Sequence, residues 1–535
     1  MRRGFWAGLI ATAIWVLPGG LLGGSQSRPP SQSQQGTQAS EANESNRCIK
    51  CHAAQVAGFA RSKMSHSMRI AGQEPSGVVQ TGSTTIRMYS DKDGSWQSVE
   101  NAGIRTTYHI DYVIGSGTHA SGYLVDLGNH LFQSPVAYYK SRAGYGPARG
   151  FERLPDPDFT RPVGEGCVFC HAGSFNAVAG TQNEYGETPF PHLAIGCSRC
   201  HGDATVHLAN PEAGNIVNPE SLDTSARDSV CEQCHLIGAA RVLNPGKRFS
   251  DFQAGEPLED IFTIYRVEAP KGTEAKFRVI SHSEQLALSK CKMSSGVKMW
   301  CGTCHDPHNE PTDSISYYRE KCLQCHATTT FVAGHPEKNS NCIGCHMPSR
   351  NAQDGGHTAF TDHRIQRTPE DEPASEAASI VAWREPPKSL AERNLGIAQI
   401  RVGLEKSDWK QVVSGYRMLT EVQHEFSQDS EMYSAIGSAL LSAKQYGEAV
   451  QAFELAVRLD PISSPKEAIL GQAFEAMGDQ AQAKQHLEEA VGLDPLNLSA
   501  ATLLIAAYER DGESAKANEL SMKIAGLTQT VVERK

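Results

Sequence analysis

Between residues 48 and 346 the sequence repeats one short pattern seven times: two cysteines separated by two residues, with a histidine directly after the second. Such a pair presents two thiols on one turn of the chain, spaced to form thioethers with the two vinyl groups of a haem, and the adjacent imidazole can bind the iron. The pattern predicts seven covalently bound haem c groups. In chain order, motifs one to seven are Cys48, Cys51 and His52; Cys167, Cys170 and His171; Cys197, Cys200 and His201; Cys231, Cys234 and His235; Cys301, Cys304 and His305; Cys322, Cys325 and His326; Cys342, Cys345 and His346.

Two other uses of paired cysteines explain this pattern less well. Zinc sites are often built from pairs of the same spacing. Zinc accounts for the cysteines but not for a histidine after the second cysteine in all seven copies. A disulfide scaffold accounts for neither the spacing nor the histidine. The sequence therefore favours haem over both.

The remaining histidines supply candidates for the second axial ligand of each iron. Eleven are left once the seven motif histidines and the two in the C-terminal part, His424 and His486, are set aside. Iron held by two histidines is six-coordinate and low-spin, which suits electron transfer. A hydrogen-bonding role is the alternative for each candidate, and it is favoured for His109, His130 and His192. The predicted distal ligands are His66, His119, His207, His308, His335, His357 and His363, with His282 as first reserve.

One cysteine, Cys291, lies outside the motifs, between Lys290 and Lys292 and ten residues before motif five. Two interpretations remain open: a small buried residue, or a thiol or thiolate close to a haem. In the second case Cys291 is a candidate catalytic residue. A haem without a fixed distal ligand would then make the protein a reductase of a small nitrogen or sulfur compound.

The elements that must position these groups are predicted from composition. Arg2 and Arg3 precede an apolar run, which indicates a signal peptide over residues 1–24, with a retained membrane anchor as the alternative. Residues 25–46 are rich in Ser, Gln and Glu and are predicted to be a flexible linker. The multihaem domain follows over residues 47–364, called the haem region below. A second linker is predicted at 365–389, helical repeats at 390–527 and a tail at 528–535.

The predicted fold class is mixed but mainly α. Seven haems share about 300 residues, too few for a conventional apolar core around each, so we expect stacked haems wrapped by short helices and loops. Motifs five, six and seven begin only about 20 residues apart, so their haems must be neighbours. Small β-elements are predicted where alternating or β-branched segments lie between turn residues, at 84–90, 95–100, 104–114, 122–127, 262–267 and 276–280.

The C-terminal part contains an internal repeat with a period of 34 residues. This period, with small residues at fixed places and a proline after the second helix, resembles the tetratricopeptide repeat. The resemblance implies about four helical hairpins, the outer two atypical, that dock a partner protein. We expect them to form a separate unit, so that deleting residues 390–535 leaves the haem region intact. The pairs that carry the period are Gly437 and Gly471, Ala449 and Ala483, Ala456 and Ala490, and Pro461 and Pro495.

Several motif surroundings resemble those of multihaem cytochromes related to the electron carrier for hydroxylamine oxidoreductase. They are Cys200-His201-Gly with His207 following, Cys304-His305-Asp-Pro-His308, and Cys345-His346-Met-Pro348. The resemblance covers about residues 48–363 and implies a periplasmic carrier with closely stacked, mostly bis-histidine haems. The known carrier type has fewer haems and lacks the repeats. A haem region combined with tetratricopeptide repeats is therefore the closer likeness.

Charge and export complete the expectation. The net charge of −10 disfavours a nucleic-acid binder, which is normally basic. Attachment of haem c takes place outside the cytoplasm, which agrees with the predicted signal. The sequence thus predicts an exported, periplasmic heptahaem protein that passes electrons between redox partner proteins and docks one of them through its repeats. Membrane association is expected only through the N-terminal segment, and the reductase remains the alternative.

Overall fold

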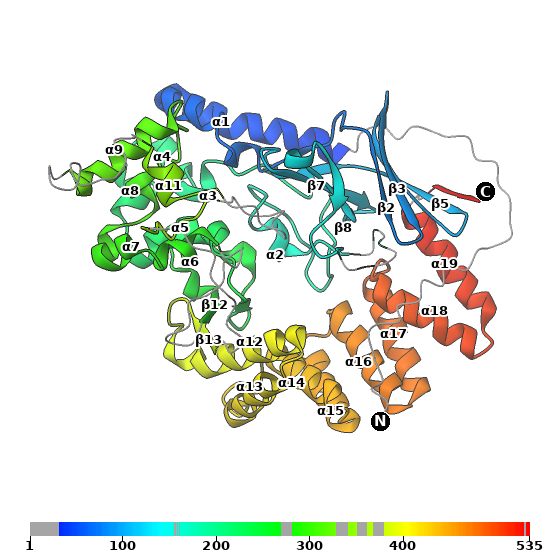
Figure 1. Ribbon diagram of the computed structural model, residues 1–535. Helices are drawn as coiled ribbons and strands as arrows, with labels where there is room; N and C mark the ends of the chain where they lie inside the picture. The colour runs from blue at the N-terminus through cyan, green and yellow to red at the C-terminus, as the bar shows by residue number, and fades with distance from the viewer. Residues whose placement is uncertain are drawn as a thin grey trace.

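The computed structural model describes residues 32–534, apart from residues 153, 155, 156, 158, 160, 269–280, 328–340, 350–360, 368–378, 529 and 530. The predicted signal peptide, the predicted strand at 276–280 and two predicted distal ligands, His335 and His357, lie outside the described residues. Figure 1 shows three parts that pack together: a group of β-sheets, a group of short helices, and an arc of paired helices.

The first described helix, Gln32–Phe59 (α1), carries motif one and runs beside both the sheets and the short helices in Figure 1. The backbone at His52 (φ −116°, ψ 41°) kinks it just after the cysteine pair. The helix begins inside the segment predicted to be a flexible linker. That prediction is wrong from Gln32 onward, because Gln and Glu are good helix formers.

Two antiparallel sheets fill the chain between motifs one and two. They confirm the β-segments predicted between residues 84 and 127, but they are larger than the small element expected. The six-stranded sheet contains Met68–Ile70 (β1), Tyr112–Ile114 (β6), Ala120–Leu127 (β7), Val136–Tyr139 (β9) and Gly144–Pro147 (β10) in the order β1-β6-β7-β9-β10, with His130–Gln133 (β8) paired to β7. The five-stranded sheet contains Gly77–Thr81 (β2), Thr84–Asp91 (β3), Gly94–Asn101 (β4) and Ile104–His109 (β5), in the order β14-β5-β4-β3-β2.

The fifth strand of that sheet, Val531–Arg534 (β14), comes from the C-terminus and pairs with β5. Within the predicted tail, residues 531–534 therefore form a strand. Alternating apolar and β-branched residues favour the hairpins themselves, and turn glycines connect them. Gly94 shows why glycine is needed at one such turn: its φ is 143°, and a Cβ there would lie 2.7 Å from Nε2 of His109.

The short helices carry motifs two to seven and are joined by irregular segments and 3-10 turns. The helices are Glu165–Val168 (α2), Ser198–His201 (α3), Thr205–Ala209 (α4), Thr224–His235 (α5), His282–Ala287 (α6), Lys290–Ser295 (α7), Cys301–Cys304 (α8), Ser314–His326 (α9) and Cys342–His346 (α11). The 3-10 turns are Met64–His66, Lys140–Arg142, Ala213–Asn215, Pro219–Ser221, Phe249–Asp251, Leu258–Asp260, Gly296–Lys298 and Lys388–Leu390.

A third antiparallel sheet lies between the short helices and the arc. It contains Ala240–Leu243 (β11), Phe262–Glu268 (β12) and Ser379–Ala382 (β13) in that order. Strand β12 confirms the strand predicted at 262–267. Strand β13 lies in the segment predicted to be a linker, so that prediction is wrong for its last part. Ile380 and Val381 are β-branched and apolar, and Ile380 is buried against the arc, so burial of this side chain holds the segment in the sheet.

Eight helices form the arc as four antiparallel pairs, as the 34-residue period predicts. The small residues of the repeat lie where two helices of a pair touch. A Cβ on Gly437 would lie 2.7 Å from the ring of Phe453, and one on Gly471 would lie 2.9 Å from Leu487. The helices are Ala391–Lys406 (α12), Trp409–Val422 (α13), Ser430–Ser442 (α14), Tyr446–Leu459 (α15), Ser464–Met477 (α16), Gln480–Leu493 (α17), Leu498–Arg510 (α18) and Ser514–Thr528 (α19).

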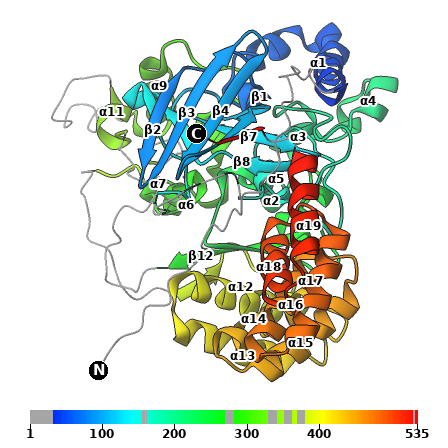
Figure 2. The same ribbon diagram turned by 90° about the vertical axis from the view of Figure 1, so that its right-hand side faces the viewer.

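The arc shares a core with the rest of the protein, and Figure 2 shows it packed beneath the sheets. One apolar cluster joins Val242, Tyr265 and Ile380 of the third sheet to Ile397 of α12. The Arg393 guanidinium, 1% exposed, donates both to Asp429 at 2.6 Å and to the Leu243 carbonyl at 2.6 Å. The repeats therefore share a core with the third sheet, which removing residues 390–535 would expose. That the haem region stays intact after this deletion remains a prediction.

A second buried contact joins the arc to the six-stranded sheet. His130 Nε2 lies 2.9 Å from Oδ1 of Asp494, and His130 Nδ1 lies 3.0 Å from the Gly128 carbonyl. Both ring nitrogens face acceptors, so both carry hydrogen and the ring is an imidazolium. Burial lowers the pKa of His130, but the bonds to Asp494 and Gly128 and the charges of Asp494 and Glu184 outweigh it and raise the pKa overall. This structural role agrees with the one favoured from the sequence.

We expect Asp494→Ala to lower the free energy of unfolding by about 3 kcal/mol, because it leaves a buried imidazolium with only the more distant carboxylate of Glu184, 3.8 Å from Nε2. The matched control is Asp460→Ala, which removes the aspartate at the same position of the preceding repeat. Asp460 pairs with Lys466 and is a third exposed, so its loss should cost less than about 1 kcal/mol. Thermal unfolding of the two variants measures the difference.

The same contact predicts a pH dependence. A raised histidine pKa stabilises the fold fully below the unfolded-state value of about 6.5, and the stabilisation is lost as pH rises through the folded-state value. The melting-temperature gap between wild type and Asp494→Ala should therefore be wider at about pH 5.5 than at about pH 9. An equal gap at both pH values would contradict the charged pair.

Candidate functional site

All seven motifs line one cavity, on the side of the molecule where the short helices gather in Figure 1. Its volume is about 4190 Å³, and its wall includes all fourteen motif cysteines and all seven motif histidines. Pockets for a single ligand measure about 300–1,000 Å³. Divided among seven groups, the cavity gives about 600 Å³ to each, which lies within that range. The space and the donor set therefore fit several large cofactors.

Capped helix turns place the cysteine pairs on the cavity wall. Asp223 accepts hydrogen bonds from the amides of Ser225 and Ala226 and starts α5, which ends on His235 of motif four. Asp313 starts α9 in the same way through the Ser316 amide, and α9 ends on His326 of motif six. Carboxylates at these positions satisfy helix amides that have no partner within the helix. Both motifs thus occupy the last turn of a helix whose start is fixed.

Four motif histidines each have a second imidazole beside them. The ring centres lie 6.2 Å apart for His52 and His207, 5.8 Å for His201 and His308, 6.2 Å for His305 and His363, and 5.4 Å for His235 and His282. A metal–nitrogen bond is about 2 Å long, and the ring centre lies about 1 Å further. Two imidazoles on opposite sides of one iron would therefore have centres about 6 Å apart. The four spacings fit a bis-histidine haem.

The hydrogen bonds of three of these rings leave the Nε2 lone pair available for a metal. Nδ1 of His201 lies 2.7 Å from the Val217 carbonyl, and Nδ1 of His207 lies 3.1 Å from the Glu212 carbonyl. Nδ1 of His363 lies 2.9 Å from the Thr361 carbonyl. A carbonyl only accepts, so each Nδ1 carries the hydrogen and each Nε2 keeps a lone pair. This arrangement is typical of metal-binding histidines.

Burial keeps several of these rings neutral. It lowers the pKa of His282 to about 3, with further lowering by the neighbouring His235, His363 and His305. Burial and His363 lower the pKa of His305 to about 4. A neutral imidazole is the form that binds a metal. At neutral pH these side chains are therefore ready to act as ligands.

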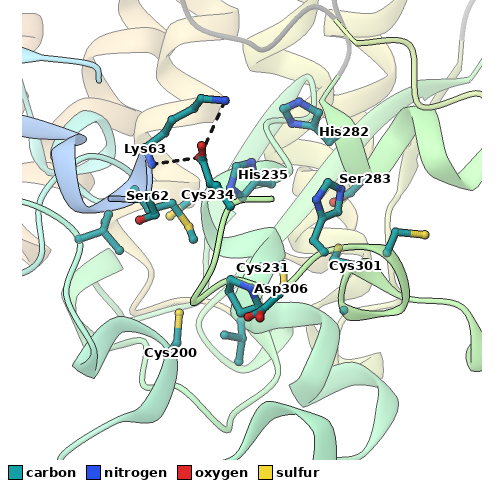
Figure 3. A pocket seen from close by; sticks show the side chains of 18 of the residues that line it. Ser62, Lys63, Cys200, Cys231, Cys234, His235, His282, Ser283, Cys301 and Asp306 are labelled. Atoms are coloured by element: carbon teal, nitrogen blue, oxygen red, sulfur yellow. Dashed lines mark hydrogen bonds and ion pairs between the residues drawn. The ribbon is translucent and has the colours of Figure 1, made fainter. Parts of the chain in front are cut away.

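Thiol contacts and helix packing join the motifs in an order that differs from their order in the sequence. Figure 3 shows Cys231, Cys234 and His235 of motif four between Cys200 of motif three and Cys301 of motif five. Helices α3 and α5 pack together, as do α8 and α9, which links motifs three to four and five to six. Thiols face each other between motifs one and three (Cys48 and Cys197), two and four (Cys170 and Cys234), four and five (Cys231 and Cys301), and six and seven (Cys322 and Cys342).

One of these thiols has an activated environment. The Cys234 thiol and the Arg241 and Arg199 guanidinium groups lower the pKa of Cys170 to about 6, against the effect of burial. Arg241 Nη1 lies 3.6 Å from the Cys170 sulfur. A low pKa favours the thiolate, which is the nucleophilic form of cysteine.

The remaining predicted ligands have different outcomes. His119 lines the cavity. His66 is outside the lining, and its Nδ1 lies 2.9 Å from the Ser62 carbonyl. The reserve residue His282 lies beside His235 of motif four. None of the seven preferred candidates is paired with that histidine. A sequence signal for it exists, because Ser281 and Glu284 form a capping box that starts α6 at His282.

The residues that the sequence analysis did not choose as ligands also differ in their positions. His109 bonds to Asp111 at 3.0 Å and lies outside the cavity lining, which agrees with a structural role. His192 lines the cavity beside Glu44, which the sequence did not indicate. Cys291 lines the cavity too. Burial raises the pKa of Cys304 and of Cys322, and the nearby Cys291 adds to both shifts.

Among the described residues, no three or more His, Cys, Asp or Glu side chains converge on a point that could hold a bare metal ion. A haem iron needs only two axial ligands from the protein, so facing pairs of imidazoles are the pattern relevant to it. None of the helices in the described part of the chain has the length and apolar character needed to cross a bilayer.

The tetratricopeptide repeat family matches residues 430–463 and 468–495, which are the two inner helix pairs of the arc. These segments are tetratricopeptide repeats. The outer two pairs have the same antiparallel arrangement. We call the four pairs the TPR solenoid from here on, and repeats of this kind are protein-interaction modules.

A similar curated protein is the multiheme cytochrome MtrA of Shewanella baltica (strain OS185). It is 23% identical over 187 residues, which cover 33% of this chain and 56% of MtrA. The chain thus spans about half the length of the curated relative it matches. The match makes haem a supported cofactor class without fixing the number of haems. It does not concern the carrier for hydroxylamine oxidoreductase, so that resemblance stays an expectation.

Solved structures with similarity to the chain include tetratricopeptide repeat proteins. MamA from Desulfovibrio magneticus RS-1 is 20% identical, with a TM-score of 0.24, over 26% of this chain and 77% of that one. The first TPR of Spaghetti (RPAP3), bound to an HSP90 peptide, is 18% identical, with a TM-score of 0.21, over 23% of this chain and 94% of that one. Because these TM-scores are low, the repeat fold is assigned from the paired helices of this chain and not from these structures.

A buried ionic network anchors motif four to the third sheet. Arg384, two residues after β13, bonds to the carboxylates of Glu232 and Glu259 and donates to Ser229 Oγ at 2.8 Å. Glu232 directly follows Cys231, and burial raises its pKa while Arg384 opposes the shift. The segment predicted to be a linker therefore fixes the position of α5.

We expect Arg384→Ala to destabilise the protein by about 3 kcal/mol, since it leaves the buried Glu232 carboxylate unpaired. Arg266→Ala is the control: Arg266 pairs with the half-exposed Glu268, so its loss should cost less than about 1 kcal/mol. Thermal unfolding and the haem content of each purified variant measure the effect. Equal melting temperatures for the two variants would show that the network does not hold α5.

Proposed function

We propose that this protein is an exported, periplasmic c-type cytochrome that carries seven haems and transfers electrons between redox partner proteins. The observation that carries the proposal is the single cavity lined by all seven motifs, with paired imidazoles at the spacing of two axial ligands. The multihaem relative supports the cofactor class. When bound, the haems supply one-electron redox chemistry.

The chain's own residues would hold each group in a defined way. The two cysteines of each motif would form the thioethers, and the motif histidine would be the proximal ligand. His207 would complete motif one, His308 motif three, His282 motif four and His363 motif five. His119 is the candidate for motif two. His335 and His357 remain candidates for motifs six and seven, and His66 is the weakest candidate because it lies off the cavity lining.

The contacts between motifs support a relay rather than seven isolated sites. They connect motifs one, three, four, five, six and seven in series, and motif two joins at motif four. His282 and His363 touch with ring centres 4.8 Å apart, which brings the ligands of motifs four and five into contact. Motif four would therefore be a branch point of the relay.

The TPR solenoid would dock a partner protein on its exposed helix faces, while its other contacts hold the cavity wall. Exposed apolar side chains on α13, Trp409 and Val413, belong to a face that the third sheet does not cover. One observation supports the second candidate function, a reductase of a small nitrogen or sulfur compound: Cys291 lines the cavity and acts on Cys304 of motif five and Cys322 of motif six.

Low-temperature electron paramagnetic resonance of the oxidised protein separates the two functions. For the carrier we expect low-spin ferric signals alone, because two imidazoles would bind each iron. A high-spin signal that shifts on adding nitrite or hydroxylamine would support the reductase and contradict the carrier. The intact mass of the exported protein should exceed that of the chain by seven haems, and a smaller excess would contradict the count.

A single axial pair can be tested by His363→Ala. We expect this variant to keep its full haem content, because the thioethers remain, but to convert one low-spin haem to high-spin. His109→Ala is the control, since His109 lies outside the cavity lining, and it should leave all signals unchanged. A His363→Ala spectrum identical to wild type would remove His363 from the ligand set.

A further inference from the structure

Tyr318 touches the proximal histidine of a neighbouring motif. It lies on α9, one turn before Cys322 of motif six. Its hydroxyl oxygen is 3.1 Å from Nδ1 of His305 in motif five, and the two rings meet edge to face with centres 5.5 Å apart. One side chain thus connects the ligand of motif five to the helix that carries motif six.

This partner differs in kind from those of two other motif histidines. Nδ1 of His201 faces the Val217 carbonyl at 2.7 Å, and Nδ1 of His346 faces the Gln366 carbonyl at 2.8 Å. A phenol oxygen is a weaker acceptor than an amide carbonyl, and its contact is longer. The acceptor at Nδ1 controls how basic a ligating imidazole is, and a more basic imidazole stabilises ferric iron. A haem bound at motif five would therefore have a less electron-rich proximal ligand than haems bound at motifs three and seven.

We propose that Tyr318 is a positioning residue that sets the reduction potential of the haem bound at motif five. The inference rests on the proposed function, since it assumes a haem at that motif. The reaction it tunes is the gain of one electron by ferric iron to give ferrous iron. The Nδ1 hydrogen stays on His305 throughout, and no proton is exchanged.

The location makes such tuning useful to the relay. Motif five lies between motifs four and six, and its distal candidate His363 also touches His282 of motif four. The potential at this point decides whether an electron arriving from either side is held or passed on. Because Tyr318 belongs to α9, the position of the motif six helix determines the acceptor that His305 meets.

The test compares Tyr318→Phe with Tyr317→Phe in the full-length, haem-loaded protein. Tyr317 is the adjacent residue, packs against Tyr318 with ring centres 5.2 Å apart, and lies beneath Lys321. Removing the Tyr318 hydroxyl leaves Nδ1–H of His305 without its acceptor, so the potential of one haem should rise. We expect up to a tenfold change in its ferric-to-ferrous ratio at a fixed solution potential, which equals 59 mV for one electron. Tyr317→Phe should leave all seven midpoints in place.

Potentiometric titration followed by electron paramagnetic resonance measures each outcome. Unchanged reduction midpoints in Tyr318→Phe, or an equal shift of all seven midpoints, would overturn the proposal for Tyr318. Neither result would touch the proposed function, provided that the wild-type protein shows low-spin haems. Absence of low-spin haem signals from the wild-type protein would instead refute the proposed function. If Tyr318→Phe binds fewer haems than Tyr317→Phe, its potentials cannot be compared with those of the control. An experimental structure of the haem-loaded wild-type protein then tests the proposal. Tyr318 Oη must lie within about 3.2 Å of His305 Nδ1, and a carbonyl or water at that position would overturn the proposal.

Discussion

The helices that carry most of the motifs are too short to hold themselves. Helices α2, α3, α8 and α11 have four or five residues, whereas an isolated helix needs roughly 12–15 residues to be even marginally stable in water. Their positions must come from contacts with larger elements. The packing of α3 against α5, and of α8 and α11 against α9, supplies part of this support. Residues of α1, of the six-stranded sheet and of the third sheet complete the cavity wall. The TPR solenoid packs against the third sheet through α12.

The solenoid therefore has a structural task besides any partner it docks. Arg393 and Asn394 of α12 bond to the carbonyl of Leu243 and the side chain of Asn244, on and beside β11, and β11 leads back to motif four. Arg384 reaches the same motif from the segment just before α12. These bonds, with the packing of α12 on the third sheet, connect α5 to the solenoid.

The sequence was a good guide where the pattern is local. The seven motifs, the hairpins between residues 84 and 127 and the 34-residue helical period all depend on neighbouring residues, and the strands and helices follow them. It was a poor guide to long-range pairing. Nothing near Ile380 indicates that β13 joins β12 across the solenoid boundary, and nothing near Asp494 indicates His130 as its partner. The sequence places His282 only in reserve among the distal ligands, because 47 residues separate it from His235 and the fold alone brings the two rings together.

Strand β14 pairs with β5 although more than 400 residues separate them. Without it, β5 would be an edge strand with a row of unsatisfied amides and carbonyls, open to pairing with other chains. Residues 531–534 thus protect the edge of a sheet built from residues 77–109. Until β14 has paired, that edge is open, so a folding copy of the chain can pair with another copy until residues 531–534 are in place.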